Sequence, residues 1–95
     1  MVVARTIAGV LKDSSGTLLT NKRIRFTPEK PFGSGGVMVG TKTETIYTDP
    51  TTAAYSVDLF TKSDEAINYK CEIGKDIFAF ALASGATTSI DALRT

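Results

Sequence analysis

Histidine is absent from this chain of 95 residues, and cysteine occurs once, as Cys71. Without imidazole, the common zinc sites and every nucleophile–histidine arrangement are excluded, and a single cysteine cannot form an internal disulfide. Catalysis would need paired carboxylates, a lysine or a metal held by oxygen ligands. The only adjacent acidic pair is Asp64-Glu65, in an expected polar turn. We therefore expect no enzyme activity, no cofactor and no metal site.

Long apolar runs and an excess of one charge are also missing. No stretch of 18 apolar residues occurs, and the first ten residues lack the basic start and cleavage site of a secretory signal. Lys and Arg number 11 against 10 Asp and Glu, so there is no global field to attract nucleic acid or an anionic membrane. We expect a soluble chain that starts at its own Met1, with neither nucleic acid nor a membrane as partner.

Short segments with the period-two alternation of β-strands fill most of the chain. Turn residues such as Asp13-Ser14-Ser15-Gly16 separate them, and the chain is expected to cross between sheets before Arg23. The expected strands are Val2–Val10, Arg23–Thr27, Val37–Thr48, Ala53–Phe60, Ile67–Ile73 and Ile77–Ala83, with a further short extended piece at Thr17–Thr20.

Two of these strands predict where the core lies. In Ile67–Ile73 the alternation is strict, which places Cys71 on the buried face as inert packing. Ile77–Ala83 is apolar on both faces, so we expect Phe78, Phe80 and Leu82 to fill the core. The flatter face formed by Ile77, Ala79 and Ala81 is expected to lie under the C-terminal tail or against another chain, with the tail favoured.

A loop rich in proline and glycine is predicted from Pro28 to Gly36. No Lys-Ser or Lys-Thr follows its glycines, so a phosphate cradle is disfavoured. Phe32 within it either tucks back onto the domain edge, which is favoured, or offers an apolar anchor to a partner.

The segment from Val37 to Thr48 is the longest predicted strand, and neither of its faces is strongly apolar in the middle. It suits an edge strand on which Lys42 and Glu44 discourage uncontrolled pairing, or a strand that reaches beyond the core to a neighbouring subunit.

Together these segments predict an all-β fold, a single sandwich of about seven strands of the immunoglobulin or prealbumin type, over residues 1–95. Residues 84–95 are expected to form a linker and a tail that docks through Ile90 and Leu93 in one helical turn.

Several short motifs carry a resemblance to a known family. They are I-x-G-x-x-x-D-x-x-G from Ile7 to Gly16, I-x-F at Ile24–Phe26, the Thr48-Asp49 turn, Tyr55-x-Val57-x-Leu59, Tyr69-x-Cys71-x-Ile73 and the closing aromatic strand. Over nearly the whole chain this pattern resembles the carboxypeptidase-regulatory or transthyretin-like β-sandwich. Stand-alone versions with a tail like that at Thr88–Leu93 are similar to small structural proteins of tailed bacteriophages.

The resemblance implies a virion protein with no chemistry of its own, a capsid cement or decoration protein that binds the major capsid protein. A tail or fibre module, or an adhesive carbohydrate-binding module, is the alternative, with Phe32 or Tyr47 as the sugar platform. A homo-oligomer is also possible. We expect partner contacts at the exposed edges and the Pro/Gly loop, through Arg23, Arg25, Lys30, Pro31, Phe32, Lys42 and Glu44.

Overall fold

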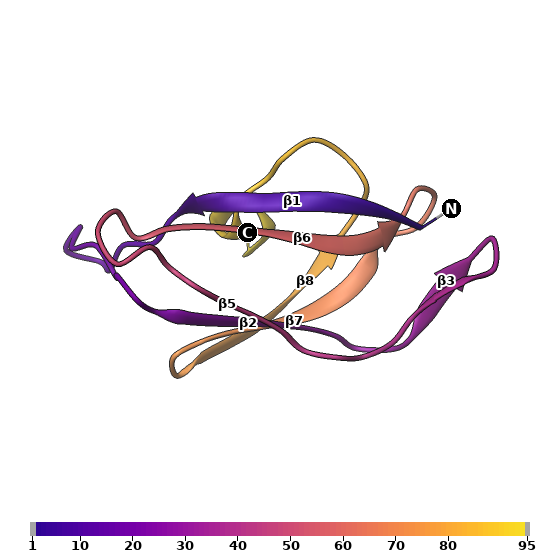
Figure 1. The fold of residues 1–95 in the computed structure, drawn as a ribbon, viewed down its shortest axis with the longest axis horizontal. Helices are drawn as coiled ribbons and strands as arrows, with labels where there is room; N and C mark the ends of the chain where they lie inside the picture. The colour runs from indigo at the N-terminus through magenta and orange to yellow at the C-terminus, as the bar shows by residue number, and fades with distance from the viewer. Residues whose placement is uncertain (1, 95) are drawn as a thin grey trace.

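The computed structural model describes residues 2–94, which form an all-β fold with eight strands and one short helix (Figure 1). The strands are β1 (Val2–Val10), β2 (Arg23–Pro28), β3 (Phe32–Ser34), β4 (Val37–Val39), β5 (Glu44–Tyr47), β6 (Ala54–Lys62), β7 (Ile67–Ile73) and β8 (Asp76–Leu82), and the helix is α1 (Ile90–Arg94). The prediction of an all-β sandwich is confirmed.

The strands form two facing layers. β5, β2, β7 and β8 make one antiparallel sheet in that order, and β1 pairs with β6 in the other layer. The β3–β4 hairpin extends from one end of the molecule, which measures 44 × 24 × 22 Å (Figure 1). β1 and β2 lie in different sheets, as the predicted crossing requires, whereas the first two strands of an immunoglobulin constant domain share a sheet.

The core lies between these layers and is centred on three aromatic rings. Tyr69 and Phe80 stack with their centroids 5.9 Å apart, and Phe26 meets Phe80 edge to face at 6.2 Å. Both arrangements are favourable for aromatic pairs. Cys71 is fully buried beside them, as its place in the alternation predicted.

The C-terminal tail docks as the sequence predicted. Thr88 forms a parallel bridge on the free side of β1, where its N–H donates to Thr6 O at 3.0 Å and its C=O accepts from Ala8 N at 2.8 Å. Ile90 is 6% exposed within the core cluster, and its N–H donates to the Tyr55 hydroxyl at 3.0 Å. The tail thus closes one side of the β1–β6 layer.

Side chains at the turns explain several residues of the family-like motif. Gly16 has a φ of 87°, which glycine adopts at no steric cost. The Ser15 hydroxyl and the N–H of Thr17 donate to the Asp13 carboxylate, and these bonds hold the pKa of Asp13 below its ordinary value. The N–H groups of Thr52 and Thr51 lower the pKa of Asp49 in the same way. Each carboxylate therefore stabilises its own turn by accepting hydrogen bonds from residues two to four positions later in the chain.

The prediction of an exposed loop from Pro28 to Gly36 is confirmed for residues 29–31 and for the Gly35-Gly36 turn, and is wrong for Pro28 and Phe32–Ser34. Pro28 ends β2 on the buried face, and Phe32–Ser34 pair with Val37–Val39. The reversal between them is made by Gly35 and Gly36, whose φ values of 60° and 83° are those of a two-residue hairpin turn. Phe32 tucks back into the core and is 9% exposed, which is the alternative that the sequence favoured.

The prediction of one long strand from Val37 to Thr48 is also wrong, because residues 40–43 separate β4 from β5. β4 pairs with β3 while β5 pairs with β2, so the chain must pass from the hairpin to the four-stranded sheet between them. No apolar face in the middle of this segment holds it against the core.

The tail does not cover the outer face of β8, contrary to the favoured expectation. Ile77 is 58% exposed, and Ala79 and Ala81 are exposed beside it. Because Thr88 pairs with β1 and Ile90 enters the core between the layers, the tail lies away from that outer face.

Candidate functional site

A groove of about 520 Å³ lies between the two layers at the end that carries the β3–β4 hairpin. On the side of the four-stranded sheet it is lined by Pro28 and Tyr69, which are neighbours across β2 and β7. On the other side lie residues 58–60 of β6, and residues 37–40 line its hairpin end.

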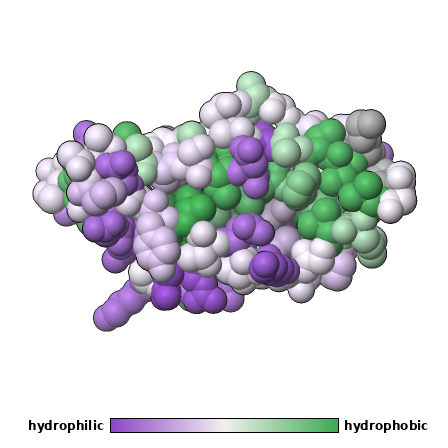
Figure 2. All heavy atoms as spheres, in the orientation of Figure 1, coloured by the Kyte–Doolittle hydropathy of each residue, from purple (hydrophilic) through white to green (hydrophobic). Residues whose placement is uncertain are grey.

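The hairpin end of the groove is apolar and exposed. Met38 is 75% exposed, Val37 53% and Phe60 50%. Figure 2 shows apolar side chains gathered on this face of the molecule toward the hairpin end. Single exposed apolar residues are ordinary on protein surfaces, but a contiguous group marks an interaction site. Met38 and Phe60 are therefore the strongest candidates for partner contact.

The rest of the groove is bordered by three charged residues, Lys42, Glu44 and Asp58. Glu44 pairs with the buried Phe26 in the β2–β5 ladder, so its side chain starts from the inner side of the sheet. Among the side chains that the structure describes, none of the three charges takes part in a salt bridge. Asp58 accepts a hydrogen bond from Thr6 Oγ1 at 2.6 Å. The groove thus has one more negative than positive charge.

Tyr69 links the groove to the core. Its hydroxyl donates to the backbone carbonyl of Phe60 at 2.6 Å, which ties β7 to β6 across the layers. Burial of the phenol, with a further contribution from the negative charge of Glu44, raises the pKa of Tyr69 to about 12.

We expect the protein to lose stability as the pH rises from about 10 to about 12. The unfolded chain releases the Tyr69 proton near its ordinary pKa of 10, whereas the folded chain holds it up to a pKa of about 12. This contribution is complete below pH 10 and is lost as pH passes through the folded pKa. Denaturant unfolding at stepped pH should show the fall, and Tyr69→Phe should reduce its slope. An equal slope in the variant would mean that other groups, such as the buried Tyr55, cause it.

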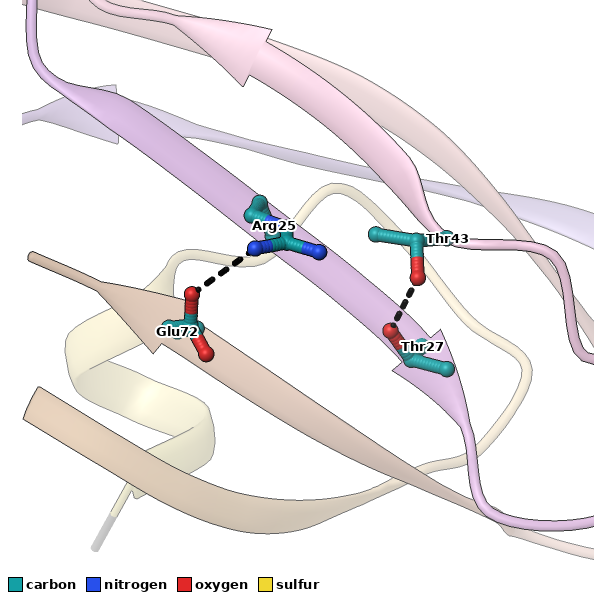
Figure 3. A network of polar contacts seen from close by, with 4 residues as sticks. All are labelled: Arg25, Thr27, Thr43 and Glu72. Atoms are coloured by element: carbon teal, nitrogen blue, oxygen red, sulfur yellow. Dashed lines mark hydrogen bonds and ion pairs between the residues drawn. The ribbon is translucent and has the colours of Figure 1, made fainter.

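A second exposed region covers the outer face of the four-stranded sheet (Figure 3). Arg25 Nη1 lies 3.1 Å from Glu72 Oε1, and the hydroxyls of Thr27 and Thr43 are 2.8 Å apart. Half-exposed ion pairs of this kind contribute about 0–1 kcal/mol, so this row is a solvated surface with little effect on stability.

The residues predicted to contact a partner fall in three places. Arg23 and Arg25 lie on the outer face of the four-stranded sheet, and Lys42 and Glu44 line the groove. The others, Lys30, Pro31 and Phe32, border a separate hollow of about 270 Å³ at the base of the hairpin. The structure therefore brings only the Lys42 and Glu44 members of the set into the groove.

Met38 and Phe60 were not predicted as contact residues, because neither is charged and both lie within predicted strands. Phe60 did leave a signal, since it shares the solvent face of its strand with Ser56 and Asp58. Alone, such a residue is ordinary on a protein surface, and it becomes a candidate contact only because the structure places Val37 and Met38 at the same groove.

Comparison with protein-family models, with curated proteins and with solved structures found no match to this chain. Among residues 2–94, no helix has the length and apolarity to cross a membrane. The same residues bring no three potential metal-ligating side chains of His, Cys, Asp or Glu together. The groove and its exposed apolar end are therefore the features that bear on function.

Proposed function

We propose that this protein is a structural protein of a bacteriophage virion, a capsid decoration or cement protein that binds the major capsid protein. The observation that carries a binding role is the exposed apolar group of Val37, Met38 and Phe60 at the groove. The family-like sequence motifs supply the virion context. A partner that covered this group would remove three large apolar side chains from water, which is the main driving force of association.

Such a protein needs a rigid body and a modest contact. The two-layered fold provides the body, since the Tyr69–Phe60 bond and the shared core tie its sheets together. A standard interface covers about 800 Å² of each partner, and many copies on one particle raise the total avidity without tighter single sites. The decoration role therefore requires no catalytic group.

The test is co-sedimentation with particles of the phage whose genome carries this chain, assembled without it. Met38→Glu should weaken binding about tenfold or more, because it places a charge in the buried centre of the interface. Ile77→Glu is the matched control. It makes the same change at an exposed apolar residue, 58% accessible, on the outer face of β8.

Two results would count against the proposal. Absence of any binding by the parent protein would remove the virion role. Loss of binding in Ile77→Glu with normal binding in Met38→Glu would keep the virion role and move the contact to the outer face of the four-stranded sheet.

One observation favours the alternative of a tail, fibre or adhesive module that binds a carbohydrate or a host surface. Tyr47 is 62% exposed and lies opposite the exposed Arg23 in the β2–β5 ladder, so an aromatic face and a cation are adjacent. Sugars stack on such faces. A glycan array that captures the parent protein and not Tyr47→Ala would support this alternative. The other aromatic candidate, Phe32, is buried.

A further inference from the structure

Among the strands that the structure describes, β6 pairs with β1 alone, and the hydrogen-bond pattern identifies which of its residues face the open side. In an antiparallel pair, residues that do not bond each other point their backbone groups away from the partner strand. Thr6 and Ala8 of β1 bond Thr88 and so face away from β6. Their ladder partners, Asp58 and Ser56, must then face away from β1, along the free edge of β6.

Phe60 follows the same alternation, and one of its two backbone groups has a partner. Its C=O accepts the Tyr69 hydroxyl, which confirms that this position faces the open side. β6 has nine residues, longer than the five or six that are usual for a strand. Natural proteins shorten, charge or cover such edges. Here Asp58 is the single charge on the open stretch between Ser56 and Phe60.

The groove lies directly at this edge, since residues 58–60 line it. Across it runs the segment that joins β4 to β5, whose Gly40 and Lys42 also line the groove. Among the described residues, no backbone–backbone hydrogen bond outside the strands involves residues 40–43. Within residues 2–94, the groove thus lies beside the open N–H and C=O of Asp58 and the open N–H of Phe60, while the Phe60 C=O is bonded to Tyr69.

Charge and side-chain direction indicate what fits. Glu44 and Asp58 outweigh Lys42, so the groove favours a cationic side chain. Along β6, Asp58 points to the solvent face while Leu59 points inward to the core. An added strand would present a basic side chain beside Asp58, and its neighbours would point inward toward the apolar lining from Leu59 and Tyr69.

We propose that the groove receives an extended segment of the partner protein, which adds as a strand to the free edge of β6 and places a Lys or Arg between apolar residues beside Asp58. This strand addition is a known mode of peptide recognition, in which main-chain bonds give affinity and alternate side chains give specificity. The inference deepens the proposed function and rests on it for the identity of the partner. A second copy fits less well, because a two-fold pairing of β6 centred on Asp58 sets two carboxylates opposite each other.

The experiment uses a synthetic peptide and requires no virus particle. The probe is the acetylated, amidated peptide Thr-Val-Lys-Val-Thr-Val, titrated to millimolar concentration into the ¹⁵N-labelled full chain. We expect amide shifts and slowed hydrogen exchange at Asp58 and Phe60, with smaller shifts at residues 40–42. The same peptide with Glu in place of Lys should bind at least about threefold more weakly. Shifts centred on β5 or β8, or equal binding of both peptides, would overturn the inference.

Two protein variants separate charge from backbone. Asp58→Ala removes the carboxylate and keeps the backbone N–H, whereas Asp58→Pro removes both. The fold should tolerate proline here, because the Asp58 N–H faces away from β1 and makes no bond in the β1–β6 ladder. Asp58→Pro should bind about three- to tenfold more weakly than Asp58→Ala, the effect of one lost hydrogen bond. Equal affinities would overturn strand addition.

N-methylated peptides keep the test independent of whether Asp58→Pro folds. One peptide is N-methylated at its odd residues and the other at its even residues. Because alternate N–H groups of an added strand face β6, at least one of the two peptides must lose the bonds to β6 and bind more weakly. Retained binding by both would overturn the inference. If the peptide fails to bind while particles still co-sediment with the parent protein, strand addition is wrong and the decoration role stands. Dimers in analytical ultracentrifugation that Asp58→Pro abolishes would point to a second copy in place of the partner segment.

Discussion

Replacing Phe80 with Ala should cost about 3–5 kcal/mol of unfolding free energy, the usual range for a buried phenylalanine. The ring is 5% exposed, stacks on Tyr69 and meets Phe26 edge to face. Its removal leaves a cavity beside the rings of Tyr69 on β7 and Phe26 on β2, which the two strands hold in place, so the site cannot collapse easily. Domains of this size have total stabilities of about 5–15 kcal/mol. Thermal unfolding followed by circular dichroism should show a midpoint lower by roughly 15 °C or more.

Phe78→Ala is the matched control on the same strand. The sequence predicted that both phenylalanines fill the core, but Phe78 is only half-buried, with its ring tilted 43° to that of Phe80 at 6.5 Å. Its replacement should therefore cost clearly less. If Phe78→Ala lowers the unfolding free energy as much as Phe80→Ala does, the half-buried Phe78 ring must be covered in solution, for example by a second chain.

Two of the strands that the sequence predicted best, β2 and β7, have one face alone buried. Ile67–Ile73 was located to the residue, because burial alternates along it without a break from Ile67 to Cys71. β1 was also located to the residue, and the first residue of β2 was correct. A period of two needs one buried face and one exposed face, which β2 and β7 have, whereas β1 is partly buried on both faces and was located from its run of apolar and β-branched residues.

The β3–β4 hairpin was missed for a physical reason. Each of its strands has three residues, too few to show a period, and the proline and glycine content around them favoured a loop. The pair Gly35-Gly36 was the available signal, since two consecutive residues able to take positive φ are typical of a tight hairpin turn.

The groove could not be predicted in the same way. Its residues come from five strands, β2, β4, β5, β6 and β7, and from the segment between β4 and β5, and only the packing of the two layers brings them together. Sequence patterns report which face of a strand is buried and do not report how far apart two sheets lie. Charged residues near loops gave Lys42 and Glu44, and the exposed apolar residues Met38 and Phe60 required the structure.

The glycine of the Ile7-x-Gly9 motif is explained by the tail. Gly9 lies opposite Tyr55 in the β1–β6 ladder, and a Cβ at this position would stand 2.7 Å from the Tyr55 hydroxyl oxygen and 3.0 Å from Cζ. The Tyr55 ring is 6% exposed, and its hydroxyl accepts the Ile90 N–H. The ring cannot move aside without losing the bond that holds the start of α1.

Gly9→Ala should therefore destabilise the protein by about 1–3 kcal/mol, as overpacking of a filled core does. It should also loosen the tail that follows Ala83 and Ala86, whose carbonyls accept hydrogen bonds from Arg5. Limited proteolysis should then cleave the tail earlier than in the parent protein. Gly40→Ala is the matched control, because nothing lies within 4 Å of its added Cβ and it has no left-handed φ. We expect it to change stability by no more than about 0.5 kcal/mol.

A double-mutant cycle with Tyr55→Phe tests the cause. Tyr55→Phe alone should cost about 0.5–1.5 kcal/mol for the hydrogen bond to Ile90 N, while it removes the atom nearest to the added Cβ. Gly9→Ala should consequently cost less in the Tyr55→Phe background than in the parent, by at least about 0.5 kcal/mol. If the changes in unfolding free energy of the two substitutions simply add, Gly9 is required by the backbone of β1 and not by contact with Tyr55. A coupling of the expected sign would establish that Gly9 leaves space for Tyr55, and that Tyr55 in turn fixes the tail on the β1–β6 layer.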